Sequence, residues 1–320
     1  MAGNKGKRFF CSRALPTAFA LSCLLTLCLL RGGMSADYLL SLFSRVLVLS
    51  VITVGAVFIF TVGAFGISLG ASTLLGLSAG AAVYGATGSI GLAFLTCIGA
   101  PTAACLISSM LSTLFDLPAY VTAALMLGLL GSVARVILEA HGGEIYTNLL
   151  GNNPFDTVGA RLWSFVLYFA LCVIIYHVTP VGKRQKALGD DRDMARLTGI
   201  SRRWYVGIGF LMAGLSVGLG AFLILCSSRS ITVSSVFDLG FNIIFAILLG
   251  GMSLSGGSKS RLLSSVTGSL SAIFLSEILR EIFGYAPTYL GISQGIRGAI
   301  LLIFMVMLAR NDKKGEKNAG

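Results

Sequence analysis

Residues 179–200 read TPVGKRQKALGDDRDMARLTGI and interrupt an otherwise apolar part of the chain. The apolar runs on either side, 162–178 and 204–226, are each long enough to cross the hydrocarbon core of a bilayer. Between them lie charged side chains at Lys183, Arg184, Lys186, Asp190, Asp191, Arg192, Asp193 and Arg196. We therefore expect residues 178–203, which we call the charged loop, to lie outside the bilayer between two membrane-spanning helices.

The composition of the whole chain indicates a helical membrane protein. Of its 320 residues, 55% are hydrophobic and 12% are charged, whereas soluble domains carry about 25% charged residues. Apolar runs of about 17–25 residues match the thickness of the hydrocarbon core. They are too long and uninterrupted for the alternating strands of a membrane barrel. We therefore predict an all-α polytopic membrane protein and exclude a water-soluble globule.

The apolar runs divide the chain into ten predicted spans in two halves, about 14–138 and 162–309. The first run follows four basic residues and resembles a signal peptide, with GMSA at 33–36 in the place of a cleavage site. Its 17 residues exceed the usual apolar region of such a peptide, and further spans follow it, so we expect a retained first helix. The third span is among the shortest, which leaves eight or nine crossings as alternatives. The predicted spans are 14–30, 43–62, 71–86, 90–113, 119–138, 162–178, 204–226, 236–251, 264–282 and 293–309.

The basic residues predict how the spans are oriented. Of 24 Lys and Arg residues, 17 fall in the segments 1–13, 178–203, 251–263 and 310–320. Ten spans with a cytoplasmic amino terminus place all four segments in the cytoplasm, where Lys and Arg are enriched. No basic patch interleaved with aromatic residues occurs, so the net charge of +11 indicates orientation rather than nucleic-acid binding. We expect both termini in the cytoplasm.

Two similar stretches indicate an internal repeat. LFDLPAYVTAALML starts at Leu114 and IFGYAPTYLGISQG at Ile282, and each places Pro-x-Tyr at the start of a predicted span. A Gly/Ser-rich segment precedes each one, at 85–91 and 250–257. The ten spans put the two Pro-x-Tyr motifs on opposite sides of the membrane, which predicts two halves of inverted topology, an arrangement typical of transporters. Chance similarity between Gly-, Ala- and Leu-rich segments is the alternative.

A few polar features lie within or beside the predicted spans. Asp238 lies at or inside the start of the eighth span, where a carboxylate is either functional or solvated among the headgroups. Arg135 and Glu139 have the i,i+4 spacing of a helix-surface ion pair. The segment GAFGISLGAS at 63–72 is either irregular backbone that is buried in protein or an ordinary short turn.

Further charges lie near the predicted external face. Glu277, Arg280 and Glu281 end the ninth span, where we expect them at the membrane interface. Arg297 lies early in the tenth span and is expected to extend its side chain outward to that interface.

No catalytic or metal-binding motif is present. GGSKS at 256–260 lacks the residues and spacing of a phosphate-binding loop, and neither HExxH nor GxSxG occurs. The seven cysteines include no CxxC pair, which implies neither a metal site nor a disulfide framework. We expect no catalytic residue, no metal site and no nucleotide site in this chain.

The charged loop and the motif GGMSLSGG at 250–257 together resemble the permease subunits of bacterial ABC importers of the ribose/monosaccharide type. That family's loop follows T-x-x-G-R-x-x-x-A-x-G-x-N-x-x-A-A-x-x-x-G-I. The second family pattern is an acidic residue in a span that ends in G-G-x-S-L-x-G-G. The loop pattern is matched by Thr179, Gly182, Ala187, Gly189, Ala195, Gly199 and Ile200, with Lys183 for Arg, Asp191 for Asn and Met194 for Ala. The second pattern is matched by Asp238, Gly250, Gly251, Ser253, Leu254, Gly256 and Gly257.

The resemblance implies a transport subunit that works as a homodimer with a separate ATPase, which uses ATP and Mg²⁺, and with an extracytoplasmic solute-binding protein that is periplasmic or a lipoprotein. The charged loop would dock on the ATPase, and a short helix over about 191–197 would begin at Asp191. Its candidate coupling residues are Gly182, Lys183, Ala187, Gly189, Asp191, Ala195, Gly199 and Ile200. Candidates for the solute route are Gly66, Ser68, Gly70, Asp238, Asn242 and Ser253.

One departure from the family bears on the solute. Gly66 stands where family members usually carry Asp, in the pattern G-I-D-L-S-V-G, while Ser68 and Gly70 are retained. The resemblance therefore implies an importer in the bacterial inner membrane more firmly than it implies a sugar as the solute. An ion- or proton-coupled secondary transporter is the main alternative, and it would need ionisable residues deep in the membrane. A membrane-embedded enzyme is a more distant one.

Overall fold

The computed structural model describes residues 17–28, 35–64, 66–115, 117–143, 145–146, 154–228, 230–231, 234–252, 256–257, 260–284 and 289–316. Seven helices within them are long and apolar enough to cross a membrane. They are α2 (Ala36–Thr61), α3 (Leu69–Thr87), α4 (Ile90–Leu114), α5 (Ala119–Glu139), α6 (Val158–Val173) with its π-helical extension η2 (Ile174–Val178), α9 (Arg202–Ser227) and α11 (Leu262–Phe283).

Three shorter apolar helical stretches complete the match with the predicted spans. They are Thr17–Cys28, Leu239–Leu249 within α10 (Ser234–Leu249) and Gly291–Ile303 within α12 (Tyr289–Glu316). Each of the ten predicted spans therefore coincides with a helix, which confirms the all-α polytopic fold. The inverted relation between the halves stays a prediction, since its second Pro-x-Tyr motif begins outside the described residues.

The sequence explains several helix boundaries. Pro118 is the N-cap of α5, as its Pro-x-Tyr motif predicted, because proline is tolerated where the first N–H groups lack helical partners. The segment between α2 and α3 is irregular, with Gly63 at φ 69°, and Val62, Ala64 and Ser68 are buried. Residues 69–72 belong to α3, and the described residues before them include turns that are buried in protein, so that a place for this segment at membrane depth stays a prediction.

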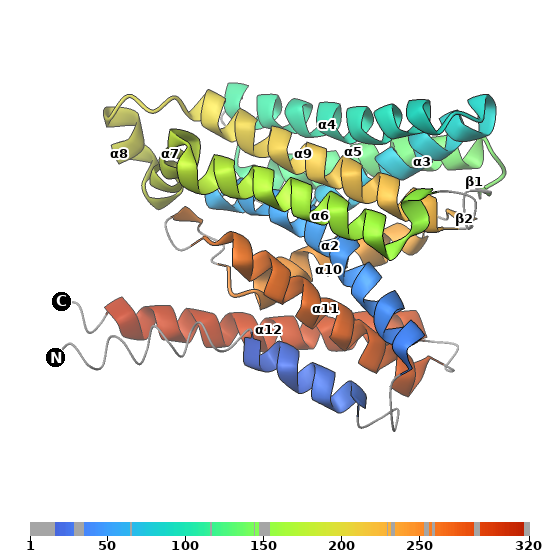
Figure 1. The fold of residues 1–320 in the computed structure, drawn as a ribbon. Helices are drawn as coiled ribbons and strands as arrows, with labels where there is room; N and C mark the ends of the chain where they lie inside the picture. The colour runs from blue at the N-terminus through green and yellow to red at the C-terminus, as the bar shows by residue number, and fades with distance from the viewer. Residues whose placement is uncertain are drawn as a thin grey trace.

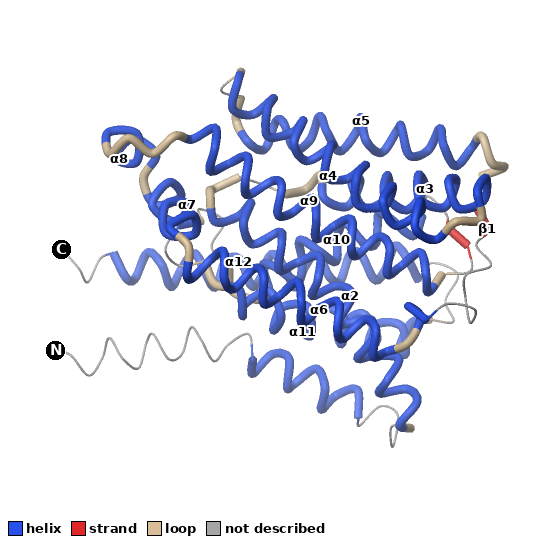
Figure 2. Tube along the Cα trace, turned by 45° about the horizontal axis from the view of Figure 1, so that its top comes forward, coloured by secondary structure: helices blue, strands red, loops and turns tan. Residues whose placement is uncertain are grey.

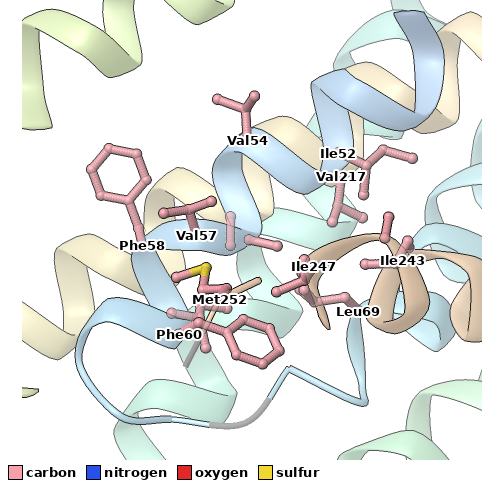
Figure 3. Packing of buried hydrophobic residues seen from close by; sticks show 14 of the residues in the cluster. Ile52, Val54, Val57, Phe58, Phe60, Leu69, Val217, Ile243, Ile247 and Met252 are labelled. Carbon is pink, nitrogen blue, oxygen red and sulfur yellow. The ribbon is translucent and has the colours of Figure 1, made fainter. Parts of the chain in front are cut away.

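Helices α2 and α9 form the centre of the bundle. In the most apolar part of α2, 89% of the residues are buried, compared with 11% in α6 with η2. Figure 3 shows side chains of α2, α9, α10 and the start of α3 packed together, among them Val57, Val217 and Ile247. Where α9 meets α4, a Cβ at Gly214 would lie 2.7 Å from Thr102 Cα. The small residues of the seventh span therefore allow close backbone contact.

The two ends of the bundle differ in their connections. Two short helices, α7 (Pro180–Asp190) and α8 (Arg192–Leu197), lie at the same end as the carboxyl end of α12 (Figure 1). At the opposite end, β1 (Ile145–Tyr146) pairs antiparallel with β2 (Ser230–Ile231). This two-residue ladder was not predicted, and it joins two loops that the topology placed on the same side. Figure 2 shows that helices account for nearly all of the remaining described chain.

One predicted surface contact is absent. Arg135 and Glu139 are both described and exposed on α5, but no ion pair joins them, so that prediction was wrong. The physical reason is that an exposed pair gains little over solvation by water.

Candidate functional site

The charged loop folds into α7 and α8 through local capping. Pro180 begins α7, and Asp191 is the N-cap of α8, where its Oδ1 accepts hydrogen bonds from Asp193 N at 2.9 Å and Met194 N at 3.1 Å. The helix ends with Gly199 at φ 76° and a bond from Ile200 N to Ala195 O at 3.0 Å. These are the features of a helix that closes on a left-handed glycine. The predicted helix at 191–197 is confirmed.

Glycines allow α7 to lie directly against neighbouring backbone. A Cβ at Gly182 would overlap the backbone of Tyr176, and one at Gly189 would overlap the carbonyl oxygen of Thr61 and the amide of Gly257. Gly257, at φ 80°, lies in turn against Asp190. The end of α7, the end of α2 and residues 256–257 therefore meet at one point, which we call the loop junction. It brings together two motifs that the sequence presented separately.

Tyr176 holds the loop junction together from within. It lies in η2, is only 1% exposed and donates a hydrogen bond to Ser260 O at 2.9 Å. Its hydroxyl is also within hydrogen-bond distance of Thr61 Oγ1, at 3.1 Å. The π-helical turn that places Tyr176 here is a rare geometry that is frequent at functional sites. This residue was not predicted, since a tyrosine within an apolar run gives no signal of such contacts.

Other contacts fix α7 to α9. Gln185 is fully buried and donates from Nε2 to Tyr205 O at 2.9 Å, and Arg184 donates to the Tyr205 hydroxyl. The Lys186 ammonium lies 4.2 Å from the centre of the Tyr176 ring. Partial burial, with repulsion from Arg261 as a smaller cause, lowers the pKa of Lys186 from its ordinary value.

The predicted coupling residues divide into two groups. Gly182 and Ala195 are buried, and Gly189 and Ile200 are partly buried, so these four anchor the loop. The other four are exposed, namely Lys183, Ala187, Asp191 and Gly199. Two apolar side chains of α8 are also exposed, Met194 and Leu197, with 83% of Leu197 accessible. This outward surface was not predicted.

The predicted route residues are not all in one place. Gly66 and Ser68 are buried between α2 and α3, and Gly70 lies against the backbone of Gly240 on α10. Asn242 lies one turn beyond Asp238 on α10. The side chain of Asp238 and the whole of Ser253 lie outside the described residues.

A cavity of about 430 Å³ lies toward the β1–β2 end of the bundle. The first half of α2, the start of α6, the end of α9, the first half of α10, the end of α11 and the start of α12 surround it, and we call it the arginine cavity. Asn242 is the only one of the described route candidates that lines it. Its charged lining consists of Arg45, Arg161, Glu277, Arg280 and Arg297.

Glu277 is at the centre of a charged cluster on one wall. Its side chain is 10% exposed and pairs with Arg45 of α2. It also accepts a bond from the Tyr38 hydroxyl at 3.3 Å and lies 3.9 Å from Arg280. That Glu277 lies at the depth of the membrane interface stays a prediction, and within the bundle a cation from α2 compensates its carboxylate. Arg45 is the single charge in the apolar stretch 38–62, which is a clue to this pairing.

Arg297 corrects one expectation. Instead of extending outward, it is 2% exposed and donates from Nη1 to Asn242 Oδ1 at 3.1 Å. Across the cavity, Arg161 pairs with Asp156 at 2.6 Å and also donates to Ser44. Both guanidinium groups face polar partners inside the bundle, which is where intramembrane charges are normally found.

Comparison with known proteins gives a consistent result. Residues 38–306 match a family described as branched-chain amino acid transport system / permease component. The probable ABC transporter permease protein YphD of Escherichia coli is 27% identical over 159 residues, which cover 48% of this chain and 45% of YphD. The ribose import permease protein RbsC of Bacillus subtilis is 25% identical over 159 residues, 50% of this chain and 48% of RbsC.

These two alignments span about half the length of the relatives they match. A longer alignment joins the chain to the ribose import permease protein RbsC of Escherichia coli. It has 23% identity over 321 aligned positions, 95% of this chain and 96% of RbsC. The similarity therefore extends over both halves of the chain.

Proposed function

Because the chain belongs to the branched-chain amino acid transport system / permease component family, we propose that it is the membrane subunit of an ATP-driven importer that translocates a small polar solute by alternating access. The ribose import permeases to which it is similar make a monosaccharide or related compound the expected solute. In this role the chain performs no bond chemistry. It stabilises inward-open and outward-open packings to different degrees.

The observation that carries the proposal is the loop junction. Residues 256–257, both glycines, lie in close contact between α7 and the end of α2, and the Tyr176 hydroxyl bonds to Ser260 and to Thr61 of α2. A displacement of α7 would therefore move α2 and the segment between α10 and α11. Packed interfaces switch between discrete arrangements rather than deform continuously, so the junction suits a transmission element.

The outward surface of α8 is the proposed contact with the ATPase. Met194 and Leu197 are exposed there beside the charges of the loop, and buried apolar anchors with a polar rim are typical of protein interfaces. ATP and Mg²⁺ would be bound by that partner, and this chain would bind no cofactor. A second copy of the chain and an extracytoplasmic binding protein, periplasmic or lipid-anchored, would complete the importer.

The proposal includes the cellular location. With several helices suited to crossing a membrane, the chain is a multi-pass membrane protein, and we place it in the bacterial cytoplasmic (inner) membrane. The charged loop and both termini would be cytoplasmic, in line with the distribution of Lys and Arg. The β1–β2 ladder and the arginine cavity would then lie toward the external side.

Purification of the full chain from its native membrane, followed by reconstitution into proteoliposomes, tests the proposal. We expect a nucleotide-binding subunit to co-purify with the chain. Uptake of [¹⁴C]ribose by the reconstituted complex should require ATP. Leu197→Ala should weaken ATPase binding by up to about 30-fold, the effect of losing an interface anchor. Leu125→Ala, an exposed leucine on α5, is the matched control and should change nothing.

The same assay separates the alternative. Ion- or proton-coupled transport requires ionisable residues inside the membrane protein, and the sequence alone indicated only Asp238. The structure adds Glu277 and Arg297, which are buried. Uptake that persists without ATP and collapses with the proton gradient would establish the secondary transporter and overturn our proposal.

A further inference from the structure

The arginine cavity has a charge that a neutral solute does not need. Its lining contains four arginines, Arg45, Arg161, Arg280 and Arg297, and a single carboxylate, Glu277. Asp156 pairs with Arg161 at the edge of the cavity, and Asp238 lies one turn before Asn242 on α10. Even with both aspartates counted, arginines exceed carboxylates. The lining therefore carries a net positive charge, and charge is poorly screened at its two most buried arginines, Arg161 and Arg297.

Arg297 is the most deeply buried of these cations. Only 2% of it is exposed, and one of its acceptors is the neutral amide oxygen of Asn242. A guanidinium carries five N–H donors in a planar fork that fits a carboxylate or phosphate with two parallel hydrogen bonds. Burial of a charge in a membrane bundle is expensive and is a mark of functional positions.

Arg161 adds a second, independent observation. Its two terminal nitrogens bond to Ser44 and Asp156, but its buried Nε has no hydrogen-bond partner within the described part of the chain. A buried donor without an acceptor is destabilising. An oxygen atom bound in the cavity would satisfy this donor.

The size and the neutral lining narrow the ligand further. A volume of about 430 Å³ lies within the range of small-molecule sites, about 300–1,000 Å³. Asn242, Ser227 and Ser276 supply polar groups that can bind hydroxyls, while Leu49, Ile52 and Leu239 supply apolar surface. We propose that the arginine cavity binds a small hydroxylated anion, with its carboxylate or phosphate group at Arg297 and Arg161. This inference rests on the proposed transport function.

Binding to the purified full chain in nanodiscs tests this directly. Three radiolabelled probes share a six-carbon chain: gluconate with a carboxylate, glucose 6-phosphate with a phosphate, and neutral glucose. We expect at least one anion to bind about tenfold or more tightly than glucose, as a charge-assisted pair provides. Which anion binds distinguishes the carboxylate from the phosphate. Equal binding of glucose, or no displaceable binding of either anion at millimolar concentration, would overturn the inference.

Variants assign the effect to the cavity. Arg297→Gln should weaken anion binding about 10- to 100-fold, the loss expected for a hydrogen bond to a charged group, and Arg297→Lys should lose less. Arg135→Gln, the same change at an exposed position of α5, should have no effect. Unchanged anion affinity in Arg297→Gln contradicts the assignment.

A measurement on the unaltered protein avoids any folding defect in the variants. Phenylglyoxal modifies arginines, and peptide mass spectrometry reports which ones. The bound anion should protect Arg297 and Arg161 while leaving Arg135 reactive, and equal reactivity with and without anion counts against the site. These binding results do not depend on ATP. ATP-driven uptake of neutral solutes alone would overturn this inference and leave the proposed function intact. Anion binding without ATP-driven uptake would support this inference and contradict the proposed function.

Discussion

The loop junction and the arginine cavity are the two ends of one bundle, and α2 runs between them. At one end Thr61 lies directly against Gly189, with no space for a methyl group. At the other end Arg45 pairs with Glu277 beside a cavity of about 430 Å³. The two positions on α2 are about 24 Å apart at 1.5 Å per residue.

The difference between the ends indicates that they have different functions. Close backbone packing transmits displacement, because it cannot be compressed, while an open charged cavity can admit a solute and change its ion pairs. A buried helix joins the two. Changes at the loop junction should therefore impair coupling and stability together, and changes at the cavity should act mainly on the solute and on the ion pairs that surround it.

The largest effect is expected for Gly189→Leu. The side chain would overlap the Thr61 carbonyl and Gly257, and separating these backbones should destabilise the junction by about 1–3 kcal/mol or more. We expect more than tenfold loss of ATP-driven uptake in proteoliposomes. Gly131→Leu is the matched control, since no atom lies within 4 Å of a Cβ there. Equal uptake by the two variants would refute the transmission role of the junction.

Loss of the ion pair at the other end should have the next largest effect. Glu277→Ala leaves Arg45 and the Tyr38 hydroxyl without this acceptor. Arg45 is half exposed and can reach water, so we expect a loss of about 1–3 kcal/mol in the free energy of unfolding, measured by denaturant titration in detergent.

Two variants control that result. Glu139→Ala, at an exposed position of α5, should leave stability within about 0.5 kcal/mol. Arg45→Glu combined with Glu277→Arg should recover part of the loss. If the double variant is as unstable as the sum of the two single ones, the contact is not an energetic pair.

Tyr176→Phe removes one hydroxyl and keeps the packing of its ring. The Ser260 carbonyl would lose a donor inside the protein, which costs about 1–3 kcal/mol when no water replaces it. We expect a lower unfolding midpoint and reduced coupling of ATP hydrolysis to uptake. Tyr120→Phe, at an exposed position of α5, should be neutral. A Tyr176→Phe variant as stable as the unaltered protein would show that the hydroxyl is not needed to hold the junction.

How far the sequence predicts these features depends on how local they are. The apolar runs locate each helix, with boundaries up to about seven residues off at the start of α2 and the end of α12, and the caps at Pro118 and Asp191 follow from neighbouring residues alone. Family motifs direct attention to the charged loop and to residues 250–257. Neither the runs nor the caps, however, show that the two motifs touch.

The features that sequence analysis missed are contacts between distant parts of the chain. Arg45 and Glu277 are separated by 232 residues, and nothing in either local sequence identifies the other as its partner. Arg297 has the sequence context of an interfacial arginine, but the rotation of α12 that turns it inward is decided by packing against α10. For the same reason Asn242 could not be separated from Gly66 and Ser68, which the fold places away from the cavity.

The smallest effect is expected at the cap of α8. Asp191→Ala removes the acceptor for the amides of Asp193 and Met194 and should destabilise this short helix by about 1 kcal/mol. Asp191→Asn keeps an acceptor and should cost less. Because the change is confined to an exposed helix, hydrogen exchange at those two amides should accelerate while exchange in α2 stays constant, and ATP-driven uptake should fall only severalfold. Faster exchange in α2 as well would mean that the cap of α8 contributes to the loop junction. Asp191 would then belong to the anchored part of the charged loop and not to its outward surface.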